Sequence, residues 1–188
     1  SEVSRQRLDR LRDEVEALRR CSDIPGVLPL LDANLAPDGG TNPWFVMGLA
    51  TSMEDTLGQS SSLGSVVEAV AAIAKTLEAV HARGLSHRDI KPDNLFWFEK
   101  RWCVGDFGLA TFEGKAAKTE RGERIGPLFF IAPEMMNDAF ASDGRAADVF
   151  SLAKTLWVLA TGQRYPMPGA YDSSFLPTRL STYVAADR

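Results

Sequence analysis

The chain has 188 residues, enough for one large domain or two small lobes with a buried core. Its apolar fraction of 45% and charged fraction of 24% are ordinary for a globular protein, and a net charge of -4 gives no support for nucleic-acid or membrane-surface binding. Cys21 and Cys103 form no CxxC pair, the N-terminus is charged, and no apolar stretch reaches the length of about 20 residues that spans a membrane. These features predict a cytoplasmic protein without a disulfide framework, a zinc motif or a membrane segment.

The first part of the chain predicts one helix and two strands. Apolar residues recur there at 3- and 4-residue steps: Leu8, Leu11, Val15 and Leu18. This spacing predicts an amphipathic helix over 4–21. Residues 27–35 and 44–49 are predicted to be strands, with a turn over 38–40 between them.

The middle of the chain predicts a helix and a hairpin. The polar, Ser-rich residues 53–65 indicate a connector that contains one helical turn. Apolar residues at helical spacing then predict a helix over 63–83, with Gly84 as its C-terminal cap. Two short apolar runs, 95–98 and 102–104, indicate the two strands of a hairpin.

Two further segments follow the hairpin. Residues 109–126 are polar and charged, which is typical of a surface loop. Residues 149–161 are mostly apolar on all sides and predict a buried helix, for which Asp148 would be the N-cap. His81 is expected on a helix surface or in a local hydrogen bond.

Three motifs follow one another in the second half of the chain: His87-Arg88-Asp89-Ile90-Lys91-Pro92-Asp93-Asn94, Asp106-Phe107-Gly108 and Ala132-Pro133-Glu134. In this order they resemble the catalytic loop, the metal-binding loop and the end of the activation segment of eukaryotic-type protein kinases. Lys91, two residues after Asp89, resembles the lysine that serine/threonine kinases, rather than tyrosine kinases, carry at this position. The resemblance extends over about residues 5–170 of the chain.

The resemblance implies the α+β, bilobal fold of the protein kinases. On this alignment residues 1–47 form part of the small lobe, with the lobe-linking helix and the strands after it. Residues 48–52 form the hinge. Residues 53–188 form the mainly helical large lobe, incomplete at the C-terminus.

The implied reaction is transfer of the γ-phosphoryl group of ATP to a serine or threonine hydroxyl of a protein substrate, with Mg²⁺ as cofactor. A carboxylate at Asp89 can accept the hydroxyl proton, and the ammonium of Lys91 can neutralise the phosphoryl group in transfer. Asn94 and Asp106 offer the hard oxygen ligands that Mg²⁺ prefers.

The same resemblance implies a nucleotide pocket. Met47 corresponds to the residue that gates the back of the adenine pocket. Gly48, Leu49 and Ala50 correspond to the hinge residues whose backbone groups bind adenine. Phe96 corresponds to part of the pocket floor, and Asp106 would lie on the phosphate side.

Further residues match regulatory and structural positions of the family. Arg88 matches the arginine that pairs with a phosphorylated residue of the activation loop, for which Thr119 is the better candidate and Thr111 the alternative. Glu14 matches the glutamate of the lobe-linking helix. His87 is expected to be a packed structural residue rather than a base, and an aspartate at Asp148 would also bind the catalytic-loop backbone.

The chain departs from the family pattern in ways that leave alternatives open. It contains no GxGxxG motif, its first lysine is Lys75, so Glu14 lacks the lysine partner, and Pro127 replaces the threonine of the substrate-docking stretch. We expect a fragment of a longer kinase rather than a natural mini-kinase. A pseudokinase that binds partners without catalysis is the main alternative. A small-molecule kinase of the aminoglycoside type is disfavoured by the second and third motifs.

Overall fold

The computed structural model describes residues 2–35, 42–58, 61–112, 129–138, 142–169 and 171–184. The helices are α1 (Glu2–Arg20), α2 (Met53–Leu57), α3 (Leu63–Ala82), α4 (Pro133–Asp138) and α5 (Gly144–Thr161). The strands are β1 (Leu30–Asn34), β2 (Trp44–Met47), β3 (Thr51–Ser52), β4 (Leu95–Phe98) and β5 (Arg101–Val104). Short 3₁₀ turns cover Pro92–Asn94, Leu176–Thr178 and Leu180–Thr182.

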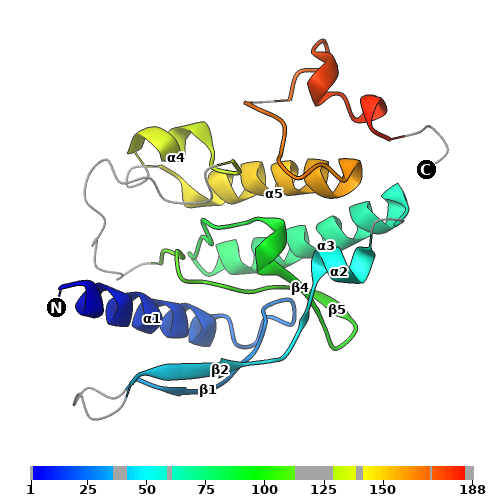
Figure 1. Cartoon of the computed structure of the whole chain (residues 1–188). Coiled ribbons are helices and arrows are strands. Elements are labelled where there is room, and N and C mark those ends of the chain that lie inside the picture. Colours follow the sequence, from blue (N-terminus) through cyan, green and yellow to red (C-terminus); the bar gives the residue numbers. More distant parts are fainter. Residues whose placement is uncertain are drawn as a thin grey trace.

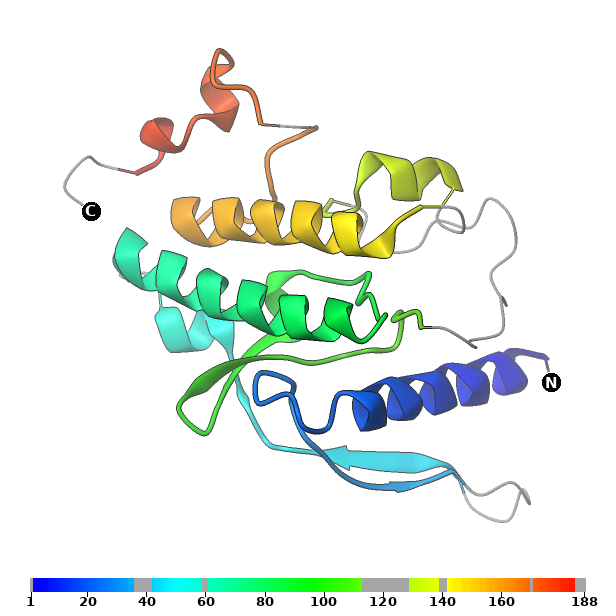
Figure 2. The ribbon, with the colours of Figure 1, turned by 180° about the vertical axis from the view of Figure 1, so that it is seen from behind.

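The elements form two groups (Figure 1). Helix α1 and the antiparallel pair β1–β2 make up one group, while α3, α5 and α4 make up the other. The three-stranded antiparallel sheet, in the order β3-β4-β5, lies between them. Seen from behind, α3 and α5 run side by side, and the green segments around the hairpin separate α3 from α1 (Figure 2). The mixed fold with few strands and several helices is the kinase-like fold that the motifs imply.

Hydrophobic periodicity located α1 and α3 correctly. The helices predicted over 4–21 and 63–83 are α1 and α3, and Gly84 follows α3 with a φ of 72°, a conformation that favours glycine. The hairpin is also confirmed, and its two turn residues, Glu99 and Lys100, both have positive φ, as a tight two-residue turn requires.

Other boundaries were wrong. Strand β1 begins at Leu30 because Val27 forms only an isolated bridge with Val104. Helix α5 begins at Gly144 with Asp143 as its N-cap, so the prediction that Asp148 caps this helix is wrong. Helix α4 was not predicted. The expected turn at 38–40 and most of the expected loop at 109–126 lie outside the described residues, as do Thr119 and Pro127.

One hydrophobic cluster connects the two groups of elements. It combines residues of α1, α3, the segment before β4, and the loop after β5, including Leu18, Ile73, Leu77, Ile90 and Phe107. Each of these side chains is at most 2% exposed, so each contributes roughly 1.5–3 kcal/mol of transfer free energy. Among the described residues, no helix combines the length and the apolar character needed to cross a bilayer.

We expect Ile73→Ala to lower the free energy of unfolding by about 2–5 kcal/mol, because it leaves a cavity at a fully buried position in α3. Val67→Ala, in the same helix but 47% exposed, is the matched control and should change stability by less than about 1 kcal/mol. Urea denaturation followed by circular dichroism measures both. Equal losses in the two variants would contradict the position of this core.

Candidate active site

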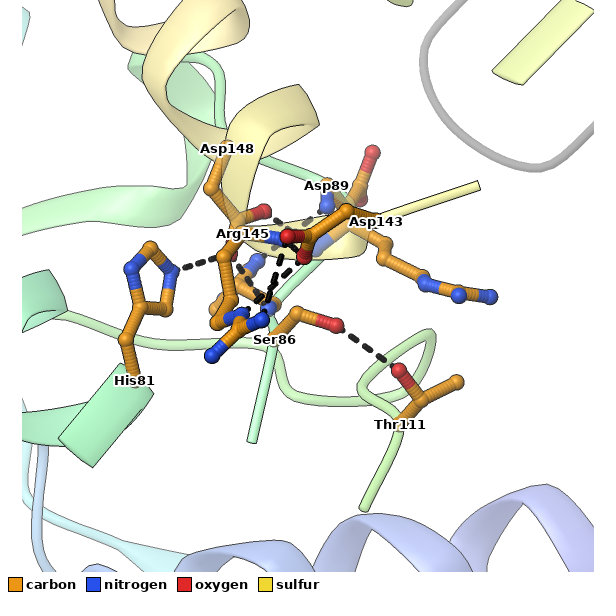
Figure 3. A network of polar contacts seen from close by, with 9 residues as sticks. His81, Ser86, Asp89, Thr111, Asp143, Arg145 and Asp148 are labelled. Atoms are coloured by element: carbon orange, nitrogen blue, oxygen red, sulfur yellow. Dashed lines mark hydrogen bonds and ion pairs between the residues drawn. The ribbon is translucent and has the colours of Figure 1, made fainter. Parts of the chain in front are cut away.

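The carboxylate of Asp148 holds the backbone of the segment that carries the first motif. It lies in α5, is fully buried, and accepts hydrogen bonds from the backbone N–H of His87 (2.8 Å) and of Arg88 (2.7 Å). His81, at the end of α3, places its Nε2 2.8 Å from the same carboxylate (Figure 3). Arg88 has a φ of 67°, unusual for a residue with a side chain, and the two hydrogen bonds that Asp148 accepts hold this conformation.

The ammonium of Lys91 and the side-chain amide of Asn94, both in the same loop, hold the carboxylate of Asp89 in place. Asp89 is 7% exposed. The Nζ of Lys91 lies 3.1 Å from its Oδ2, and the Nδ2 of Asn94 donates to the same Oδ2 and to the backbone oxygen, both at 2.8 Å. Neither side-chain bond uses Oδ1. The three residues predicted to be catalytic therefore form one connected group.

Backbone contacts bring Asn94 close to Asp106. The N–H of Gly105, the residue before Asp106, donates to the backbone oxygen of Asn94 at 3.0 Å. The oxygen of Gly105 lies 2.9 Å from Nε2 of His87, which is fully buried and packs edge-on against Phe107 at 4.6 Å between ring centroids. The structural role expected for His87 is thus present. The same contacts fix the chain immediately before Asp106.

Asn94 and Asp106 are the residues of this region that could hold a Mg²⁺ ion. The amide nitrogen of Asn94 faces Asp89, so its Oδ1 is turned away from that carboxylate. Asp106 is exposed, with a φ of 56°. In the described part of the chain, no three His, Cys, Asp or Glu side chains form a metal-binding cluster. One carboxylate and one amide are enough for Mg²⁺, which usually keeps waters and binds substrate phosphates as well.

Glu14 of α1 reaches the second motif. A methyl group on Gly108 would lie 3.2 Å from Oδ1 of Asp106 and 3.5 Å from Oε2 of Glu14, so both carboxylates border Gly108. Burial first, and then the charge of Asp106, raise the pKa of Glu14 to about 7, although a hydrogen bond from the backbone of Phe107 opposes the shift. Glu14 is therefore not a solvated carboxylate on the helix surface.

The residues predicted to bind adenine lie at the end of β2, in the segment between β2 and β3, and within β4. Met47 is partly buried, and the N–H of Gly48 donates to the oxygen of Pro29 at 3.1 Å. Leu49 is 97% exposed, and Ala50 is half-buried beside β3.

Two glycines in this region allow aromatic rings to approach the backbone. A methyl group on Gly48 would lie 2.7 Å from the ring of Phe98. A methyl group on Gly105 would lie 2.8 Å from the ring of Phe96, so Phe96 packs directly against the residue before Asp106. A cavity of about 610 Å³ lies elsewhere, between α2, the start of α3 and the end of α5, and none of the predicted site residues line it.

Arg88 lies beside a pair of hydroxyl groups. Its Nε is buried and has no hydrogen-bond partner among the described residues. Burial lowers the pKa of Arg88, while Asp148 and Asp143 oppose the shift. Ser86 and Thr111 join their backbones in an isolated bridge, and their hydroxyl oxygens are 2.7 Å apart (Figure 3).

Some residues of the site were missed by sequence reasoning. His81 makes a long-range contact with Asp148 rather than the expected local one. Gly144 was not considered, yet a methyl group there would lie 2.2 Å from Oγ of Ser86 and 2.8 Å from Nε of Arg88. Apolar periodicity carries no signal for either contact, because both join segments that are distant in the sequence.

Residues 1–176 match the family model described as the protein kinase domain. The chain belongs to the protein kinase family. It is 32% identical over 176 residues, 90% of the chain, to the serine/threonine-protein kinase AfsK of Streptomyces griseus. It is also 32% identical over 173 residues, 87% of the chain, to the DNA damage-responsive serine/threonine-protein kinase RqkA of Deinococcus radiodurans. A Wee1-like protein kinase of Oryza sativa subsp. japonica is 32% identical over 123 residues, 65% of the chain.

The matched region covers only part of each relative. The chain spans 21% of the length of AfsK, 25% of RqkA and 23% of the Wee1-like kinase. The comparison therefore identifies this kinase domain and leaves the activity, substrates and partners of the whole protein to be inferred.

We expect Asp148→Asn to lower the free energy of unfolding by about 2–4 kcal/mol, because the buried amide cannot replace both carboxylate acceptors. Asp143→Asn is the isosteric control. This exposed N-cap of the same helix should change stability by less than about 1 kcal/mol, since asparagine caps helices as well as aspartate does. Thermal or urea unfolding of the two variants tests the difference, and similar losses would contradict the role of Asp148.

Glu14 should make stability pH-dependent when divalent cations are absent. Its pKa rises from an ordinary 4.5 to about 7 on folding, so the folded state binds the proton more tightly. The contribution to stability is complete below pH 4.5 and is lost as the pH rises through 7. We expect Glu14→Gln to remove this loss, which the difference in urea unfolding from the wild type measures at pH 5 and pH 8. Glu16→Gln, on the same helix, should follow the wild type.

Proposed function

We propose that this chain is the catalytic part of a serine/threonine protein kinase that transfers the γ-phosphoryl group of ATP to protein hydroxyls. The observation that carries the proposal is the connection of Asp89, Lys91 and Asn94 in one group, with Asn94 bonded to the residue before Asp106. The relatives named as serine/threonine kinases support the same acceptor class.

Asp89 would accept the proton of the attacking hydroxyl. Because Lys91 and Asn94 both bind Oδ2, the carboxylate is oriented and Oδ1 can face the substrate. The ammonium of Lys91, 3.1 Å from Oδ2 of Asp89, would approach the phosphoryl group in transfer. When bound to Asn94 and Asp106, Mg²⁺ would neutralise phosphate charge.

The hinge and the core would hold the nucleotide next to these groups. Gly48, Leu49 and Ala50 would contact adenine through their backbones, and Met47 and Phe96 would border the ring. Arg88, whose buried Nε has no partner among the described residues, would donate to a phosphate of the activation loop, for which Thr119 is the candidate. This contact would link activation to Asp89, the next residue in the chain.

A non-catalytic scaffold is the second candidate. The observation in its favour is that Glu14 borders the carboxylate of Asp106, whereas the kinase resemblance pairs this glutamate with a lysine. Two carboxylates facing each other disfavour nucleotide phosphates until a cation neutralises them.

We expect Asp89→Asn to lower the rate of phosphoryl transfer by about 100- to 10,000-fold, because the amide cannot accept the hydroxyl proton. The measurement uses the full-length protein, Mg·ATP labelled in the γ-phosphate, and peptide arrays with serine, threonine or tyrosine acceptors. Asp93→Asn is the control, since Asp93 is exposed in the same loop. Full activity of Asp89→Asn would contradict the catalytic assignment. Activity on tyrosine alone would contradict the acceptor class.

A further inference from the structure

Two aromatic side chains of β4 pack against glycines at the two ends of the predicted nucleotide pocket. Phe96 and Phe98 lie on the same face of the strand, because side chains two residues apart point to the same side. A methyl group on Gly105 would lie 2.8 Å from the ring of Phe96, and one on Gly48 would lie 2.7 Å from the ring of Phe98. Carbon atoms in contact prefer about 3.5–4.0 Å, so each ring occupies the space of a missing side chain.

Gly48, the first residue of the predicted hinge, is held from two directions. Its N–H donates to the oxygen of Pro29 at 3.1 Å, and the ring of Phe98 lies where its side chain would be. Gly48 is buried, whereas the next residue, Leu49, is 97% exposed. The φ of Gly48 is not positive, so its backbone conformation does not call for glycine. The contact with Phe98 is therefore what excludes a larger residue at this position.

The sheet fixes the two rings relative to each other. Strand β4 is the central strand of the sheet β3-β4-β5, and Phe96 pairs with Ser52 of β3 and with Cys103 of β5. The chain enters β3 from the hinge and leaves β5 shortly before Asp106. Phe96 and Phe98 are about 6.6 Å apart along the strand, and this spacing cannot change while the strand stays paired. One strand thus contacts both the hinge and the residue before Asp106.

We propose that Phe98 is a positioning residue for the nucleotide. Its ring holds the hinge backbone at Gly48, just as the ring of Phe96 holds the residue before Asp106. Together the two contacts set the distance between the end of the pocket that binds the base and the end that binds the phosphates. Phe98 acts through Gly48 and does not touch the reacting phosphate. The proposal rests on the nucleotide binding of the proposed function and adds a residue to which that function gives no role.

An exchange of side-chain volume between Gly48 and Phe98 tests the contact. The full-length protein is used, and the fluorescence of mant-ADP with Mg²⁺ gives the Kd. We expect Gly48→Ala to raise the Kd about tenfold, because the new methyl group and the ring cannot both keep their positions. Adding Phe98→Leu, which removes the ring, should bring the Kd back to within about threefold of the wild type. Competition by adenosine should change by the same factors, since the hinge would bind the base.

Matched controls separate this role from general packing. Trp97 lies between the two phenylalanines on the other face of β4, where its ring centroid is 4.6 Å from that of Trp102. Trp97→Leu should lower the unfolding temperature and leave the Kd unchanged, and it should not relieve the effect of Gly48→Ala. Gly64→Ala controls for the glycine substitution itself, because a methyl group there would lie 3.6 Å from Oγ of Ser62, an ordinary contact.

Hydrogen exchange gives a second readout that does not depend on the folding of Gly48→Ala. In Phe98→Leu, the peptide that contains Gly48 should exchange about fivefold faster than in the wild type, while the peptide that contains Gly105 keeps its rate. A wild-type Kd for Gly48→Ala, a defect that Phe98→Leu does not relieve, or unchanged exchange would each overturn the positioning role.

Failure of the proposed function gives a different result. A wild-type protein that binds neither mant-ADP nor adenosine would overturn both the proposed function and the role of Phe98. Nucleotide binding with the expected dependence on Gly48 and Phe98, but without phosphoryl transfer, would overturn the kinase assignment and support the positioning role.

Discussion

The contact between the carboxylate of Asp148 and the backbone of His87 and Arg88 is the constraint on which the rest of the site depends. It places a buried carboxylate near the start of α5, where only hydrogen bonding makes burial tolerable. Two backbone N–H groups and the ring of His81 supply those bonds. In return they hold the positive φ of Arg88, and this turn orients Asp89. The loop that carries Asp89 is thus attached to the helix that is also packed in the core.

The same helix organises the irregular chain around it through a row of polar side chains. Asp148, Ser151, Lys154 and Trp157 follow at intervals of three residues and bind backbone groups of separate segments. A helix that is apolar on most sides would pack well but would not specify where loops lie. Hydrogen bonds to individual backbone groups give these loops defined positions, because a shift would leave buried polar groups unpaired.

Sequence patterns predicted the parts of this molecule that depend on local physics. The helices α1 and α3 have clear apolar periodicity, and the motif residues were recognisable by their chemistry and order. The start of α5 was misplaced because an aspartate at Asp148 is also a reasonable N-cap, and only the contacts distinguish the two: Asp143 accepts from the N–H of Arg145, whereas Asp148 binds the distant His87 and Arg88. The roles of His81 and Gly144 depend on distances across the fold, which a single sequence does not encode in any periodic form.

The close fixation of Gly105 has a mechanical consequence for the residues after it. Both backbone groups of Gly105 are bonded, one to Asn94 and one to His87, whereas Asp106 is exposed and has left-handed backbone angles. A rotation about the backbone bonds of Asp106 would therefore turn Phe107 and Gly108 while the hairpin before Gly105 stays in place. Phe107, the residue after Asp106, is fully buried. A rotation at Asp106 that moved Phe107 out of the core would expose an aromatic ring to water. Burial of Phe107 therefore opposes any rotation at Asp106 that would move this ring out of the core.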